Sequence, residues 1–327
     1  YLYDMINKYG DLRGVLEELD RRNQSPDYLF VFFPETIELP EGIHACPCPI
    51  IAFVCEANIR YQIIRAYCDL FDLIIADAEE LYTNLIMDGA QNVICQNWWG
   101  YHPRYHLKYE PEIDRDINVL FVGNLNADVQ EERGRLLYLL GSSDISKVVI
   151  TTGVFEEQYR QLLNRAKIVL NLNVRGEMNM RCFEATASGA MLIVDDNQNI
   201  RKLFTPGKDC VVFSRDNGME AIESIKYYLK NDIEREIIAS HGYQTVLSYT
   251  YCNVLDNIIN TLLDDSSLKI RALQRLNKPD LTKLHLIIAK SGFSSGRRNL
   301  LPLHEYEYIN NESLKCNNIG VFFCIKG

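Results

Sequence analysis

Short apolar segments alternate with segments of helical periodicity from the beginning of the chain. Apolar runs at 28–33, 49–54, 73–76 and 92–95 predict strands, and the periodic segments 12–22, 58–68 and 79–88 predict helices. Short apolar strands separated by amphipathic helices are typical of a parallel sheet covered on both faces. We therefore expect residues 1–100 to form a Rossmann-like domain.

The alternation pauses over 101–116, a segment rich in aromatic, proline and charged residues that we interpret as a linker, and then resumes. Strands are predicted at 118–122, 147–150, 168–171, 191–194 and 211–213, and helices at 131–140, 155–165, 180–188, 218–230, 233–248 and 252–263. The fold class is therefore α/β, with a second Rossmann-like domain over 117–264 and a cleft between the two. In such sheets ligands bind at the carboxyl ends of the strands.

The remaining segment, 265–327, is less regular. It carries one short predicted helix near 268–276 and a candidate hairpin at 306–323, and the sequence assigns it no role. The first strand expected of a Rossmann-like domain would precede Tyr1, so we expect the first domain to be truncated.

Composition and charge narrow the function classes. The formal net charge is −10 and the pI is near 5.2, which argues against broad binding of nucleic acid or anionic membranes but is compatible with a local basic pocket for a phosphate. No apolar run approaches the ~20 residues of a membrane-spanning helix. Ten cysteines lie scattered, without a CxxC pair, which favours a reduced cytoplasmic protein. Cys46-Pro-Cys48 is an alternative candidate for a metal or redox pair.

The segment 171–213 contains the clearest candidates for a ligand-binding site. A predicted strand is followed by a loop with Gly176 and Glu177 and then by a helix that ends at Gly189. Arg181 and Glu184 are three residues apart and share one face of that helix. A helix N-terminus after a glycine-containing loop offers free N–H groups to a phosphate, and a carboxylate one turn further can accept from two ribose hydroxyls. The alternative is an ordinary surface ion pair between Arg181 and Glu184.

The residues Asn179-Met-Arg-Cys-Phe-Glu-Ala-Thr-Ala-Ser-Gly-Ala190, with Leu203-Phe204-x-x-Gly207-Lys-Asp-x-Val-x-Phe213 after them, resemble the signature of the CgeB-like (spore-maturation) glycosyltransferases. These belong to the group 1 glycosyltransferases of GT-B fold. The resemblance covers roughly 25–259 and is most specific around Arg181, Glu184 and Gly189. It implies a sugar transfer from a nucleotide-diphosphate donor, with the acceptor bound by the domain 1–100 and the nucleotide-sugar by the domain 117–264.

The resemblance also implies roles for single residues. Glu184 matches the glutamate that binds the ribose, Arg181 an arginine facing the diphosphate, and Gly123 a glycine whose loop lies near the phosphates. Arg133, with Arg135 as the competing choice, fits a basic residue of the phosphate site. Many retaining relatives have seven residues between a sugar-contacting glutamate and the ribose-binding one, whereas only six separate Glu177 from Glu184. Gly176 therefore occupies the aligned position, unless the loop is shortened and Glu177 contacts the sugar.

The catalytic group is less clearly marked. Glu56 follows the strand 49–54 and is a candidate for a general base or a sugar-orienting group. The cluster of Trp98, Trp99, His102 and His106 could stack a sugar or a base, or could pack at a domain hinge.

The resulting hypothesis is a metal-independent, cytoplasmic glycosyltransferase that needs no cofactor besides its donor. Its acceptor is unidentified and could be a glycan, a protein or a small molecule. Two alternatives stay open: a non-catalytic nucleotide-binding or coat-associated module on the same scaffold, and a nucleotide-sugar epimerase.

Overall fold

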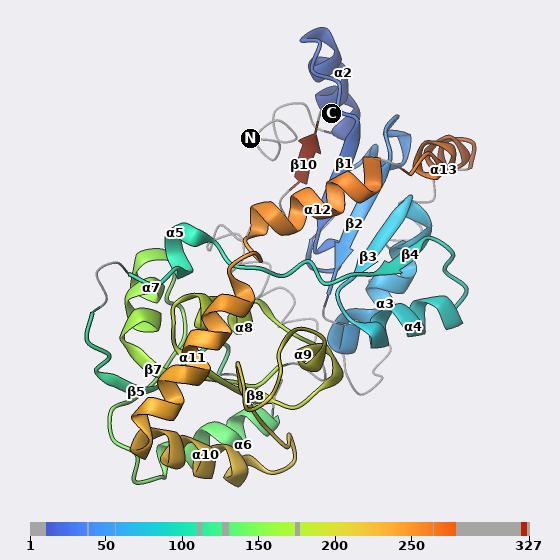
Figure 1. Ribbon diagram of the computed structural model, residues 1–327. Coiled ribbons are helices and arrows are strands. Elements are labelled where there is room, and N and C mark those ends of the chain that lie inside the picture. The colour runs from blue at the N-terminus through green and yellow to red at the C-terminus, as the bar shows by residue number, and fades with distance from the viewer. Residues whose placement is uncertain are drawn as a thin grey trace. The chain divides into compact units, whose positions relative to one another are not determined.

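The structure is a computed structural model. It describes residues 11–37, 39–55, 57–109, 113–125, 131–173, 177–263, 265–278 and 322–325. The chain divides into two compact units, one formed by Tyr1–Asn97 with Ile259–Gly327 and the other by Trp98–Ile258. Each unit is built on its own sheet (Figure 1).

The first unit is built on a sheet whose strands follow the order β10-β1-β2-β3-β4. The central strands run parallel and β10 pairs antiparallel with β1. Every residue of β1, β2 and β3 is buried, which explains their unbroken apolar sequences. The strands are β1 (Tyr28–Phe32), β2 (Ile50–Val54), β3 (Leu73–Ala76), β4 (Val93–Cys95) and β10 (Phe322–Ile325).

The helices of the first unit follow the apolar spacing of the sequence. In α2, the side chain of Asp11 accepts a hydrogen bond from the N–H of Gly14 (2.9 Å) and so caps the helix, which buries Leu12, Val15 and Leu19. The helices are α2 (Leu12–Arg21), α3 (Ala57–Tyr67), α4 (Glu79–Met87) and α13 (Ser267–Leu276), with α12 (Tyr251–Leu263) shared by the two units.

Helix α13 is joined to the first unit by a buried arginine. The guanidinium of Arg275 forms an ion pair with Asp72 (3.1 Å) and donates to the carbonyl oxygens of His44, Cys46 and Cys48. Arg275 and Asp72 are both 3% exposed. Part of the segment that the sequence leaves without a role therefore packs as an integral piece of the first unit.

The second unit contains a parallel sheet in the order β6-β5-β7-β8-β9. Its strands are β5 (Ile117–Val122), β6 (Val148–Thr151), β7 (Ala166–Asn171), β8 (Met191–Asp195) and β9 (Val211–Phe213). Its helices are α5 (Pro103–His106), α6 (Glu131–Gly141), α7 (Glu156–Arg165), α8 (Met180–Ala187), α9 (Gln198–Leu203), α10 (Gly218–Lys230) and α11 (Asp232–Val246).

The observed elements match the predicted ones to within a residue or two, with three differences. The segment predicted as a linker contains the short helix α5, which begins at Pro103. Helix α9 was not expected. The predicted hairpin at 306–323 lies largely outside the described residues, and its last residues form part of β10.

Two further features bear on the predicted setting. None of the described helices is both long enough and apolar enough to cross a membrane. The Sγ atoms of Cys46 and Cys48 lie 3.4 Å apart in the buried interior of the first unit.

Candidate nucleotide-binding site

Polar side chains gather at one edge of the second sheet. Strands β5, β7, β8 and β9 are parallel, so their carboxyl ends meet at the same edge. Gly123 follows β5, Asn171 ends β7 and Asp195 ends β8, while Arg215 lies two residues beyond β9. The sequence thus brings this set together through the sheet topology, at the place where open α/β sheets bind ligands.

Arg181 lies in the first turn of α8, beside Gly123. The side chain of Asn179 caps the helix by accepting from the N–H of Arg181 (3.1 Å), and the Nη1 of Arg181 donates to the Oδ1 of Asn171 (2.6 Å). A Cβ atom at position 123 would lie 2.7 Å from the Nη2 of Arg181. Glycine is therefore required at 123 for the guanidinium to occupy this position, and the predicted pair is brought together.

Arg133 reaches the same edge from α6. Its side chain donates to the carbonyl oxygens of Asn124 (3.2 Å) and Leu172 (2.8 Å). Burial, together with the charges of Arg181 and Arg215, lowers the pKa of Arg133 to about 10. The competing candidate Arg135 is exposed and pairs with Glu131 on the outer face of α6.

Arg215 completes the group and was missed by the sequence analysis. Its Nη1 donates to the carbonyl oxygen of Asn173 (2.8 Å) and to Asp195 (3.1 Å), while its Nε donates to Glu132 (2.7 Å). The signal available in the sequence was its place directly after a predicted strand, at the carboxyl edge. We call Arg133, Arg181 and Arg215 the arginine cluster.

The arginine cluster brings three positive charges to one strand edge, where Arg215 is paired with Asp195 and with Glu132. Asp195, 1% exposed, is the buried carboxylate beside it; burial raises the pKa of Asp195, while the N–H of Asn173 and the charge of Arg215 act in the opposite direction. The buried Nε atoms of Arg133 and Arg181 have no hydrogen-bond partner among the described residues. Unsatisfied guanidinium donors at a strand edge form a site suited to an anion.

Glu184 lies one turn after Arg181 on α8 and is 5% exposed. Its Oε2 accepts from the hydroxyl of Tyr159 (2.9 Å), and its Oε1 lies 3.4 Å from the Nε2 of His106. Burial raises the pKa of Glu184 to about 7, against the hydrogen bond from Tyr159 and the charge of Arg181, which lower it. Because Glu184 is buried, it does not form the solvated surface ion pair with Arg181 that was the alternative interpretation of the sequence.

The remaining candidate residues from the sequence analysis lie in different surroundings. Glu177 is buried just before α8, at 7% exposure. Gly176 and Glu56 lie outside the described residues. Trp98 and Trp99 are buried and stacked on each other, with ring centroids 4.2 Å apart, whereas His106 faces Glu184. The aromatic cluster therefore divides into packing residues and one histidine at the candidate site.

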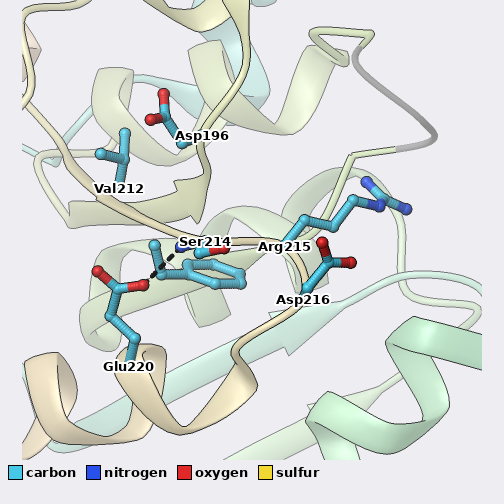
Figure 2. Close-up of a pocket in the computed structure, with 7 residues that line it drawn as sticks. Asp196, Val212, Ser214, Arg215, Asp216 and Glu220 are labelled. Carbon is cyan, nitrogen blue, oxygen red and sulfur yellow. Dashed lines mark hydrogen bonds between the residues drawn. The ribbon is translucent and has the colours of Figure 1, made fainter.

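A pocket of about 380 Å³ opens at the ends of β8 and β9 (Figure 2). The N–H of Ser214 donates to Glu220 (2.7 Å) across it, and Arg215 and Asp216 extend away from Glu220. Arg215 belongs to both the pocket and the arginine cluster. Within the described part of the chain, no three His, Cys, Asp or Glu side chains are grouped so that they could hold a metal ion.

Comparison with known proteins places these features in a family context. Residues 115–260 match the model of the "Glycosyl transferase-like" family. This range contains the whole arginine cluster and Glu184. No curated protein matches the sequence.

Solved structures share the fold of both units. HepE from Anabaena, solved in complex with UDP-glucose, aligns with a TM-score of 0.58 at 12% identity, covering 77% of this chain and 82% of that protein. Sucrose-phosphate synthase from Thermosynechococcus elongatus aligns with a TM-score of 0.53 at 11% identity, covering 77% and 78%. TarM aligns with a TM-score of 0.51 at 11% identity over 67% of this chain. This chain spans about half (51%) of the length of TarM.

These findings confirm the predicted α/β class with two parallel sheets and the GT-B fold, and residues 115–260 agree with the glycosyltransferase prediction. They do not distinguish the CgeB-like proteins from other members. The chain has the GT-B fold, and its residues 115–260 match the Glycosyl transferase-like family.

Proposed function

We propose that the protein transfers a sugar from a nucleotide-diphosphate donor to an acceptor hydroxyl, and that the second unit binds the donor. The arginine cluster would hold the diphosphate and Glu184 the ribose. The observation that carries this proposal is the approach of Arg181 to Gly123, with its Nε unsatisfied among the described residues, one helical turn from a buried carboxylate. The cation and the carboxylate thus lie one helical turn apart on α8.

The donor is proposed to be a UDP-sugar. HepE, which shares the fold, was solved with UDP-glucose, and the family match covers the arginine cluster and Glu184. The resemblance of the α8 segment to the CgeB-like proteins supports the narrower proposal that the chain is one of them. The acceptor and its binding surface are not part of this assignment.

The proposed chemistry is a substitution at the anomeric carbon. The bond from that carbon to the diphosphate oxygen breaks, a bond to the acceptor oxygen forms, and the acceptor hydroxyl loses its proton. Negative charge develops on the leaving diphosphate, and fixed guanidinium donors stabilise it without reorganisation. Arg133 and Arg215 are held rigidly by backbone carbonyls, so the cluster is organised before the donor binds. We propose that the reaction needs no metal ion, and that Glu56 serves as base or sugar-orienting group.

Calorimetry with UDP tests the donor site. Arg181→Ala should weaken UDP binding by about 1.5–3 kcal/mol, the usual contribution of a hydrogen bond to a charged group, and should leave uridine binding nearly unchanged. Arg135→Ala is the matched control, because Arg135 lies in the same unit on an exposed surface. Equal losses for UDP and uridine, or equal effects of the two variants, would contradict the assignment of Arg181 to the diphosphate.

Incubation with UDP-sugars then separates catalysis from binding. Slow hydrolysis of the donor supports a transferase. Binding without turnover would favour a non-catalytic module, and isomerisation of the sugar would favour an epimerase.

A further inference from the structure

Two helices other than its own hold the carboxylate of Glu184. Tyr159 on α7 donates its hydroxyl to Oε2 (2.9 Å), and His106 at the end of α5 faces Oε1 with its Nε2 (3.4 Å). The rings of Tyr159 and His106 meet edge to face, with centroids 5.6 Å apart. Both side chains are nearly buried, at 8% and 9% exposure, so neither is a chance surface contact.

The orientation of His106 is fixed by the backbone. The N–H of His102 donates to the Nδ1 of His106 (3.0 Å), so Nδ1 is an acceptor and the proton of the neutral ring lies on Nε2, toward Glu184. Burial and the neighbouring His102 lower the pKa of His106 to about 4, which keeps the ring neutral near pH 7. Tyr159 and His106 therefore present an O–H and an N–H to one carboxylate.

We propose that Tyr159 and His106 are positioning residues that hold Glu184 ionised and oriented toward the donor ribose, and so set the pH above which the donor binds. This inference rests on the proposed function. A carboxylate offers about four lone-pair sites; the hydroxyl of Tyr159 occupies one by a hydrogen bond, and the Nε2 of His106 lies 3.4 Å from the other carboxylate oxygen. The remaining lone-pair sites of the Glu184 carboxylate can then accept hydrogen bonds from the two ribose hydroxyls.

Burial, and not the neighbouring charges, makes Glu184 the group whose pKa lies near neutral pH. Burial raises its pKa to about 7, and Tyr159 and Arg181 oppose that rise. From α12, Tyr251 faces the carboxylate, and burial raises the pKa of this phenol so that it stays neutral. The titratable groups of α11, which packs on α8, contact other partners. Tyr243 lies beside Lys108 and His241 beside the carbonyl of Lys208. Arg235 pairs with Asp232 and Glu236, and Glu234 accepts from Tyr227.

Protonation of Glu184 replaces an acceptor with a donor. Both ribose hydroxyls can donate to a carboxylate, but a carboxylic acid gives up part of that acceptor capacity. Donor affinity should therefore rise with pH through about pH 7 and level off above it. Removal of the Tyr159 hydroxyl withdraws a hydrogen bond from the ionised form, so the pH midpoint should move upward.

The experiment is calorimetry with UDP-glucose from about pH 6 to pH 8.5. Its diphosphate is esterified at both ends and has no proton to lose in that range. If Tyr159→Phe moves the midpoint up by about one unit, binding becomes about fivefold weaker at pH 7 but less than about twofold weaker at pH 8.5. Tyr138→Phe is the matched control, because Tyr138 is 74% exposed on α6 of the same unit.

Several outcomes decide the question. If the wild type binds UDP-glucose with a pH-independent affinity, the inference fails and the proposed function stands. An equal loss at every pH in Tyr159→Phe would indicate a structural role and would overturn the inference. Should Tyr159→Phe not fold, His106→Phe is expected to shift the midpoint in the same direction, and no shift overturns the inference. Absence of binding at every pH refutes the proposed function and the inference with it.

Discussion

The substitution Gly123→Ala tests the geometry of the diphosphate site with a single methyl group. The added Cβ would lie 2.7 Å from the Nη2 of Arg181 and 3.3 Å from the ring of Phe121. The first distance is far inside van der Waals contact, so the guanidinium must move. Its movement breaks the 2.6 Å hydrogen bond to Asn171 and takes the charge away from the strand edge.

The expected loss follows from the interaction that the methyl group displaces. A hydrogen bond to a charged group contributes about 1.5–3 kcal/mol, which corresponds to about a tenfold to hundredfold weaker affinity for UDP. Uridine, which lacks the diphosphate, should bind nearly as before. Gly141→Ala is the control, because a Cβ at position 141 meets no atom within 4 Å.

The assay is calorimetry on a double-mutant cycle. If Gly123→Ala acts by displacing Arg181, it should have little further effect on UDP affinity in an Arg181→Ala background. Additive losses in the double variant would refute this reasoning, because the methyl group would then disturb the site by another route. An unchanged affinity in the single variant would refute it as well.

Two further predictions concern stability. Glu184→Gln should change the pH dependence of unfolding, because the pKa of Glu184 is about 7 in the folded protein and the ordinary value is 4.5. The wild type should therefore lose stability as pH rises from about 4.5 to 7, by an amount on the order of 3 kcal/mol that the variant should not lose. Urea denaturation at pH 5 and at pH 8 measures the difference, and parallel pH profiles for the two proteins would contradict the burial of an ionisable Glu184. Arg275→Ala leaves the buried carboxylate of Asp72 without its cation, at a cost of about 3–5 kcal/mol, whereas Arg13→Ala, on the exposed surface of the same unit, should cost little. Thermal unfolding compares the two, and equal midpoints would show that the buried pair does not stabilise the unit.

The strands were predictable because burial on both faces of a sheet requires an unbroken run of apolar residues in each strand. Leu73–Ala76 is apolar throughout, and its boundaries in the structure are the predicted ones. The choice between Arg133 and Arg135 was also within reach. Arg133, Leu136 and Leu140 follow a helical repeat and form the buried face of α6, and Arg135 does not belong to that repeat.

Contacts that depend on tertiary structure were beyond sequence reasoning. The place of Arg215 after a predicted strand was visible in the sequence, but its pairing with Asp195 follows only from the sheet order. Tyr159 and Glu184 are 25 positions apart, and no periodicity links them. The bond from Arg275 to Asp72 spans 203 positions, so nothing local indicated that α13 belongs to the first unit.

The central claim is that one turn of α8 holds the two halves of a nucleotide-diphosphate donor. A crystal structure of the protein with UDP tests it most directly. The account predicts the diphosphate against Arg181 at Gly123 and the ribose hydroxyls on the carboxylate of Glu184. A nucleotide bound elsewhere, with Glu184 still enclosed by Tyr159 and His106 and out of its reach, would contradict the account.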